Sequence, residues 1–278
     1  MALNSPRFKG EHAFERIDQG HDIIARGATG RHIHILQMAL IDLGFPMPIS
    51  TMSRHYSPDG VYGAETEAVV AKFQKVNPPL QEDGEVGLNT LRKIDDLVGG
   101  FKHRVRLHFR SLALSDVPFD RILSSAQKVY AQYAIDISFA SGQSLGLSAE
   151  EESRFTTVAQ NCVWDVSGGE FESLHKLGTP VPGNDIKVFI VNKFQEGNVV
   201  GCGGHAVGHP ACAVTHDAPR WDMAHEVGHV LLTSSFDPVH SDSKRNLMYF
   251  APSGDATPLT FTEKQLGKIR SSPLCRTI

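Results

Sequence analysis

The feature that most constrains this chain is a five-residue run, His225-Glu226-Val227-Gly228-His229. Two histidines four positions apart lie on one face of a helix, one turn above each other, so their rings can converge on a single ion. The glutamate between them can reach a water molecule held by that ion without being a ligand itself. Apolar residues continue the helix on both sides: Trp221, Met223, Ala224, Val230, Leu231 and Leu232. The run therefore predicts a buried helix that carries two metal ligands and a base.

A third ligand is expected beyond the end of this helix. His240 comes eleven residues after His229, and Met248 comes eight residues after His240. A catalytic zinc ion usually takes three protein ligands and keeps its fourth position for water. Because proline cannot continue a helix, the segment Phe236-Asp237-Pro238 breaks it. We therefore predict that His240 returns to the ion from a loop.

Other side chains compete for the third position, because carboxylate oxygen also binds zinc. The rivals of His240 are Asp237, Asp242 and Glu263. For Glu263 a structural role fits better, since Thr262-Glu263-Lys264-Gln265 has the pattern of a capping box that opens a final helix through Ile269. Further histidines in a glycine-rich segment before the motif are interpreted as loop or strand residues rather than ligands: His205, His209 and His216.

These residues together resemble the metzincin metallopeptidases, whose signature is a helical His-Glu-x-x-His, a third histidine after a glycine turn, and a methionine turn beneath the metal. The triplet Leu247-Met248-Tyr249 and its distance from His240 look like the matrixin branch. The chain departs from the family between His229 and His240. Leu232 stands at the glycine position, Ser235 stands at the third-histidine position, and the histidine follows five residues later.

The resemblance implies a zinc-dependent peptidase. It assigns the Zn²⁺ ligands as His225, His229 and His240. Met248 would form the hydrophobic floor of the site. Glu226 would take a proton from the attacking water and pass it to the leaving amine. Tyr249 directly follows the methionine, whereas metzincins that use a tyrosine there carry it one residue later, so it is interpreted as a wall residue of the pocket.

A second organised region lies earlier, from about residue 26 to residue 95. Two Asp-Gly-x-x-Gly turns, at residues 59–63 and 83–87, are each followed three residues later by a threonine, Thr66 and Thr90. Glycine supplies the positive backbone dihedrals of the turns, and the threonines are predicted to cap the helices behind them. Apolar residues at helical spacing predict short amphipathic helices packed on one another: Ile33, Leu36, Leu40, Leu43, Val69, Val70 and Phe73.

This repeat resembles the small three-helix peptidoglycan-binding domain that is often attached to cell-wall enzymes. The resemblance covers nearly the whole region, although segment 46–57 before the first turn is longer than expected. It implies peptidoglycan as a partner, bound in a shallow groove near the turns and helix starts. The alternative is a spacer or a protein-docking module, since a fold alone does not fix function.

The chain is therefore predicted to be a multidomain protein of the α and α+β classes. Val98-Gly99-Gly100 marks a boundary. It separates a peptidoglycan-binding-like helical domain over residues 20–98 from a metzincin-like zinc peptidase domain over residues 101–278. The second domain is expected to have a mixed sheet and an active-site helix, with strands at 105–112, 135–139 and 186–191 and a helix at 119–133. Segments 199–200 and 211–214 are expected to form an edge hairpin or a loop before the active-site helix. An edge strand beside the cleft would suit an extended peptide.

Composition limits the possible partners. A chain of 278 residues with 41% hydrophobic and 21% charged residues supports two globular domains. The net charge of −4 gives no basic footprint and argues against a nucleic-acid partner. No apolar run approaches the length of a membrane span.

The expected location rests on two conflicting features. The first ten residues contain no hydrophobic signal core, whereas a wall-binding module acts outside the cytoplasm. The four cysteines all lie in the second domain, and we interpret them as disulfides Cys202–Cys212 and Cys162–Cys275, with four free thiols as the alternative. We expect export to the periplasm or extracellular space without a classical signal peptide, as for an antibacterial effector with an immunity or inhibitor protein as partner. A cytoplasmic location is the alternative.

Two functions fit these features. One is a zinc endopeptidase targeted to the bacterial cell wall, which hydrolyses peptide bonds of peptidoglycan or of wall-associated and periplasmic proteins. The other is a non-catalytic wall-binding protein with a structural or vestigial zinc site. A structural zinc usually has four protein ligands and would leave Glu226 without a role, which favours the peptidase.

Overall fold

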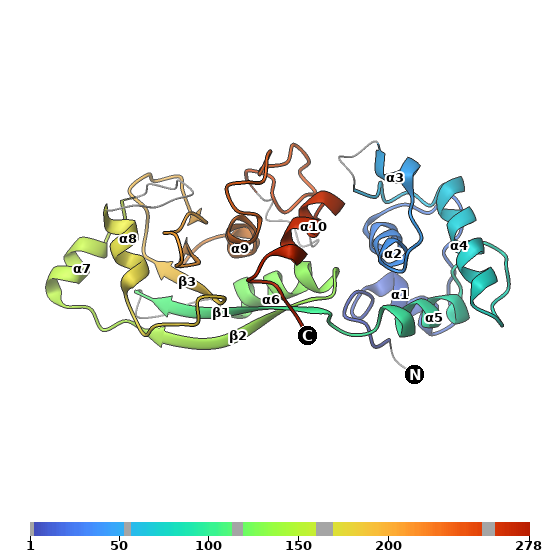
Figure 1. Ribbon diagram of the computed structural model, residues 1–278, viewed down its shortest axis with the longest axis horizontal. Coiled ribbons are helices and arrows are strands. Elements are labelled where there is room, and N and C mark those ends of the chain that lie inside the picture. The colour runs from blue at the N-terminus through green and yellow to red at the C-terminus, as the bar shows by residue number, and fades with distance from the viewer. Residues whose placement is uncertain (1–2, 53–56, 113–118, 160–168, 252–258) are drawn as a thin grey trace. The chain divides into compact units, whose positions relative to one another are not determined.

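The computed structural model of the chain describes residues 3–52, 57–112, 119–159, 169–251 and 259–278 (Figure 1). Its contacts divide the chain into two compact units. The first unit comprises Met1–Lys102, Ala131–Ile135 and Thr262–Leu266, and the second comprises His103–Tyr130, Asp136–Phe261 and Gly267–Ile278.

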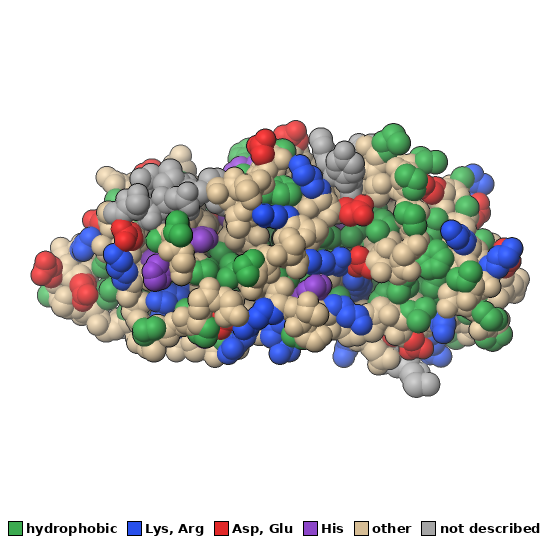
Figure 2. Space-filling model, in the orientation of Figure 1, with side chains coloured by type: hydrophobic (Ala, Val, Ile, Leu, Met, Phe, Trp, Pro, Cys, Tyr) green, Lys and Arg blue, Asp and Glu red, His purple; other side chains and the backbone are tan. Residues whose placement is uncertain are grey.

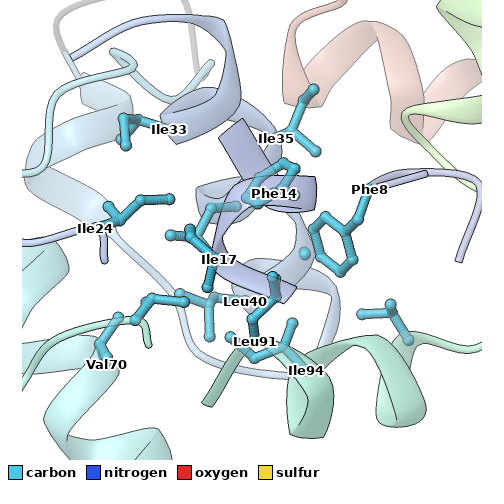
Figure 3. Close-up of a cluster of buried hydrophobic side chains, with 14 of the residues drawn as sticks. Phe8, Phe14, Ile17, Ile24, Ile33, Ile35, Leu40, Val70, Leu91 and Ile94 are labelled. Carbon is cyan, nitrogen blue, oxygen red and sulfur yellow. The ribbon is translucent and has the colours of Figure 1, made fainter. Parts of the chain in front are cut away.

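The first unit is helical. Its helices in the described part of the chain are α1 (His12–Asp18), α2 (Arg31–Asp42), α3 (Pro48–Met52), α4 (Ala64–Val76) and α5 (Leu88–Val98). The long helices follow the predicted apolar periodicity, and their inward side chains meet in one core (Figure 3). Phe8, Phe14 and Ile17 belong to the same core. The packed unit therefore reaches back beyond the predicted start at residue 20.

Buried glutamines hold the two Asp-Gly turns. At the first turn, the Gln37 amide nitrogen donates to Asp59 Oδ1 at 3.0 Å and to Thr66 Oγ1 at 3.1 Å. The Gln37 amide oxygen accepts from the Gly60 N–H at 3.0 Å. Gln37 has no exposed surface, so its amide groups are satisfied entirely inside the unit.

The second turn repeats these three hydrogen bonds. Gln74 donates to Asp83 Oδ1 at 2.8 Å and to Thr90 Oγ1 at 3.1 Å, and it accepts from the Gly84 N–H at 2.8 Å. The glutamine precedes its aspartate by 22 positions in the first turn and by 9 in the second. The additional residues in the first repeat include α3, in the segment that is longer than expected.

The predicted caps of α4 and α5 are wrong. Gly63 and Gly87 stand at the N-cap positions, and neither helix has a side-chain cap. Thr66 and Thr90 lie inside the first turns of their helices, where their hydroxyls accept from the glutamine amides. Each hydroxyl binds a glutamine that is distant in the sequence, so it does not cap its helix.

Over its described residues, the second unit is built on a six-stranded mixed sheet. Its strands are β1 (His103–Ser111), β2 (Ile135–Ser144), β3 (Ile186–Val191), β4 (Gly201–Cys202), β5 (Ala211–Thr215) and β6 (Arg276–Thr277). The order is β2-β1-β3-β5-β4, and β6 pairs with β1. β1, β3 and β5 are parallel neighbours, while β4 and β6 run antiparallel to β5 and β1. The predicted mixed sheet is confirmed, and the edge hairpin is β4 with β5.

Helices pack against this sheet (Figure 1). In the part of the chain that the structure describes, the remaining helices are α6 (Phe119–Ala131), α7 (Ala149–Phe155), α8 (Gly169–Lys176), α9 (Asp222–Leu232) and α10 (Glu263–Ser271). Phe155 of α7 and Phe171 of α8 share a core with Phe189, Ala211 and Ala213 of the sheet. α9 packs along β5 and β4. The predicted multidomain α and α+β class is therefore confirmed.

Both predicted disulfide pairs are wrong. Cys202 is disulfide-bonded, but Cys212 and Cys275 are buried free thiols. Cys202 is the cross-strand neighbour of Ala213, so its side chain faces the same side of the sheet as Ala213. Cys212, one residue earlier on β5, faces the other side, where its thiol lies near Glu226. Cys162 lies outside the described residues.

The surface agrees with the balanced composition. On the face shown in Figure 2, Lys and Arg side chains are interspersed with Asp and Glu side chains. Among the described residues, no helix has the length and apolar character that crossing a bilayer requires.

Candidate metal centre

Helix α9 carries the sequence motif. It is almost entirely buried, and its apolar side packs on β5 and β4. The helix ends at Leu232, and Thr233 at its C-cap has a φ of 64° while its N–H bonds to the His229 carbonyl. In the metzincin signature a glycine makes this turn. Here Thr233, one residue after Leu232, makes it in a conformation that favours glycine. From this turn the chain continues toward His240.

The structure brings three histidine rings together. His229 Nε2 lies 2.9 Å from His225 Nε2 and 3.2 Å from His240 Nε2. One ligand atom from each residue lies within 4.8 Å of the others. Zinc–nitrogen bonds of about 2.0–2.1 Å would place the nitrogens of a tetrahedral site about 3.3 Å apart. The three nitrogens thus fit a zinc ion, and they come from the two helical histidines and the loop histidine that the sequence singles out.

Backbone groups orient this cluster. The Leu247 carbonyl lies 2.7 Å from His225 Nδ1, and because a carbonyl can only accept, Nδ1 carries the proton. Nε2 of the neutral ring is then left as the lone-pair donor that a metal needs. The Ser241 N–H donates to the Met248 carbonyl at 2.7 Å. The loop that carries His240 is therefore tied, one residue later, to the segment that orients His225.

The electrostatics keep the rings neutral. Burial lowers the pKa of His225 to about 4, against a smaller raising effect of its bond to the Leu247 carbonyl. Burial, together with the neighbouring His225 and His240, lowers the pKa of His229 to about 2. Burial also lowers the pKa of His240. Neutral imidazole is the form that coordinates a metal, so protons compete weakly for these ligands at neutral pH.

Glu226 lies buried beside the cluster, with 7% of its surface exposed. Burial, and next the nearby Asp222 carboxyl, raise its pKa well above the usual value, while a hydrogen bond from the Gly203 N–H acts in the opposite direction. Burial likewise raises the pKa of Asp222 to about 6. A carboxyl in this setting binds a proton more readily than one in water, which is what a proton-transfer group requires.

Glycines of the edge segment allow this close approach. A methyl group at Gly201 would lie 2.4 Å from Glu226 Oε1. At Gly203 it would lie 2.4 Å from His229 Cβ and 2.8 Å from the Glu226 carbonyl oxygen. β4 and the residue after it therefore pass α9 at backbone contact. The sequence analysis missed both residues, although the run Gly201-Cys202-Gly203-Gly204 was visible as a signal.

Met248 packs against helix α9 at Gly228. A methyl group at Gly228 would lie 2.5 Å from Met248 Sδ, so the thioether fills the space that a side chain would take. The Met248 N–H is held by Asn246 Oδ1 at 2.8 Å. The Tyr130 hydroxyl, which would lie 3.5 Å from the same methyl group, donates to the Ala224 carbonyl at 3.1 Å.

The competing ligands lie elsewhere. In the described part of the chain, the one group of metal-binding side chains contains neither Asp237 nor Asp242. Glu263 belongs to α10, whose capping box is present: the Gln265 N–H donates to Thr262 Oγ1 at 3.1 Å, and the Thr262 N–H donates to Gln265 Oε1 at 2.9 Å. The earlier histidines also lie outside the group: His205, His209 and His216.

Comparison with known proteins bears on the two units differently. Residues 29–94 match the family model described as a putative peptidoglycan binding domain, so the resemblance of the first unit is confirmed. No curated protein matches the chain. Among solved structures, the chain is similar to archaemetzincin from Methanopyrus kandleri, with a TM-score of 0.39 and 11% identity, over 60% of this chain and 94% of that one.

Proposed function

We propose that the chain is a zinc-dependent endopeptidase that acts at the bacterial cell wall. The observation that carries the proposal is the convergence of three neutral imidazole nitrogens beside a buried carboxyl on the same helix. The ligands are His225, His229 and His240. Three ligands leave a fourth position for solvent, as in catalytic rather than structural zinc sites.

The chain's own residues supply the proton transfers. When bound, a zinc ion provides a Lewis acid toward a water molecule and the scissile carbonyl. Glu226 accepts the proton of the attacking water and delivers it to the leaving amine nitrogen. Its burial favours the protonated form that the second transfer needs. Gly203 holds the carboxylate through its N–H, and Met248 supports the helix from below.

The substrate is proposed to be the peptide part of peptidoglycan or a protein within the wall. The match of residues 29–94 supports peptidoglycan as a binding partner. Delivery to the periplasm or extracellular space follows from that partner. An antibacterial effector with a cognate immunity protein is one form that such an enzyme takes.

Purified sacculi and casein separate the two substrates. The full chain would be incubated with each, with and without a chelator, and the products followed as soluble muropeptides or acid-soluble peptides. Chelator-sensitive release of muropeptides supports a wall hydrolase, and cleavage of casein alone supports a protease held at the wall. Absence of both activities in the zinc-loaded protein would overturn the proposal.

The second candidate is a non-catalytic wall-binding protein with a structural or vestigial metal. It predicts that the full chain binds sacculi equally well before and after Glu226→Ala and releases no product in either form. The buried, proton-binding setting of Glu226 favours the enzyme, because a structural zinc needs no such group.

A further inference from the structure

A second cleft lies on the α8 side of the sheet. It has a volume of about 240 Å³ and is framed by the loop after α8 and the loop before β5. Three prolines line it, together with Lys187 of β3: Pro180, Pro182 and Pro210. Proline fixes its own backbone and has no N–H to donate. The walls are therefore stiff and apolar, and the polar character of the cleft comes from a few side chains.

Lys187 is a partly buried cation without an acidic partner. Its Nζ donates to the His175 carbonyl at 3.3 Å and to the Leu177 carbonyl at 3.2 Å. In the described part of the chain, no carboxylate pairs with it. Burial, and next the charge of Arg110, lower its pKa. An ammonium has three N–H groups, so one remains for a ligand.

Arg110 adds a second cation behind the same loop. It is 2% exposed, and its guanidinium donates to the Thr179 carbonyl at 3.0 Å and the Phe109 carbonyl at 2.8 Å. Its Nε is buried and has no hydrogen-bond partner among the described residues. A methyl group on Gly178, which lines the cleft, would lie 2.9 Å from that Nε.

Two neighbouring cations with neutral partners leave the cleft with uncompensated positive charge. Buried charges are normally paired, because desolvation is costly. Lys176 at the rim does not change this balance, since it is paired with Glu172 at 2.7 Å. Among the described residues, no acidic side chain lines the cleft. An oxyanion would provide the missing countercharge.

We propose that this cleft binds a carboxylate or phosphate carried on a ligand about the size of one amino-acid residue, with Lys187 as the contacting cation. The cleft uses none of the metal-binding residues. Lys187 faces the α8 carbonyls, whereas Cys212, on the side of α9, lies near Glu226. The site is therefore separate from the metal centre.

Isothermal titration of the full zinc-loaded chain tests the proposal, with inorganic phosphate in one arm and N-acetylglutamate in the other. Saturable binding is expected in at least one arm, and the arm identifies the anion. Lys187→Met keeps the aliphatic stem and removes the charge, so it should weaken binding at least ten-fold. Lys75→Met is the control, because the Lys75 side chain is 69% exposed on α4. Its binding should equal that of the unsubstituted chain.

Val181→Trp is a second variant that fills the cleft while both cations stay in place. Loss of binding at an unchanged melting temperature in Val181→Trp supports the site even where Lys187→Met does not fold. No saturable binding in either arm would overturn the proposal. Equal affinity of folded Lys187→Met and the unsubstituted chain would also overturn it, because the anion would then bind at another site, such as the metal centre.

Discussion

The Asp-Gly turns of the first unit and the metal centre of the second both bury polar side chains, but they treat them differently. Gln37 and Gln74 have their amide groups bonded within their own turns. At the candidate metal centre, three Nε2 atoms face one another, and the Leu247 carbonyl fixes the outer nitrogen of His225. Polar groups that are hydrogen-bonded to one another stabilise the fold. Polar groups whose lone pairs all point toward one position are arranged to bind a ligand there.

The largest effect is expected for Glu226→Gln, which removes the base and keeps the size of the side chain. The turnover number should fall by about 10²–10⁴, while zinc content and melting temperature stay the same. Glu150→Gln, on the exposed start of α7, is the matched control and should retain full activity. Normal turnover by Glu226→Gln would mean that the buried carboxyl is structural, like the glutamine amides.

Two glycine substitutions should separate catalysis from folding. Gly201→Ala places a methyl against the Glu226 carboxylate, which can move, so activity should fall with little loss of stability. Gly203→Ala meets His229 Cβ and the helix backbone, which cannot move as freely, and overpacking of this kind costs about 1–3 kcal/mol. Chemical denaturation and peptidase assays on both variants measure the difference. Equal effects on stability would contradict it.

Substitutions in the glutamine networks should lower stability without lowering peptidase activity. Gln74→Leu leaves the Gly84 N–H and the Thr90 hydroxyl without their buried partner, at a cost of about 1–3 kcal/mol to the first unit. The rate of cleavage of a soluble peptide should not change, because the metal centre is untouched. Gln37→Leu is the internal control and should behave alike. A loss of peptidase rate in either variant, with the second unit folded, would break the distinction.

His175 tests whether an unsatisfied polar group alone marks a site. Both its ring nitrogens are buried without hydrogen-bond partners among the described residues, and burial lowers its pKa to about 3. Since the unfolded value is near 6.5, the unfolded state binds more protons below that pH, and stability falls as pH falls from 6.5 toward 3. Phenylalanine binds no proton, so between pH 6.5 and 3 the unfolding free energy of His175→Phe should fall less steeply, by about 1.4 kcal/mol per pH unit, than that of the unsubstituted chain. Parallel denaturation curves for both proteins at every pH would contradict this.

The smallest effect is expected at the helix end. Thr233 has a φ of 64°, a conformation that costs a β-branched residue of order 1–3 kcal/mol. Glycine avoids this strain, but its greater entropy in the unfolded state offsets part of the gain. Thr233→Gly should therefore raise stability by about 1 kcal/mol and leave zinc content unchanged. Lower stability of this variant would show that the threonine side chain has a role of its own.

Local patterns predicted much of the structure. The strand at 186–191 and the capping box of α10 follow from periodicity and end signals alone, and the His225–His229 pair follows from helix geometry. Those features depend on residues a few positions apart. The repeated turns were also visible in the sequence, as two copies at a spacing of 24 residues.

Long-range contacts explain what the sequence did not reveal. Thr66 is bonded by Gln37 from 29 positions away, so its cap-like pattern was misleading. Cys202 and Cys212 are close in sequence but face opposite sides of the sheet, since strand alternation depends on a register that the sequence leaves open. The close passage of Gly203 likewise appears only once α9 and β4 are packed together.

The central claim is that three imidazoles hold one catalytic ion, and metal stoichiometry tests it most directly. Elemental analysis of the protein purified with zinc and then dialysed should give one zinc per chain, retained in Glu226→Gln and lost in His240→Ala, whose control is His216→Ala. A metal-free unsubstituted chain, or full zinc retention by folded His240→Ala, would contradict the claim.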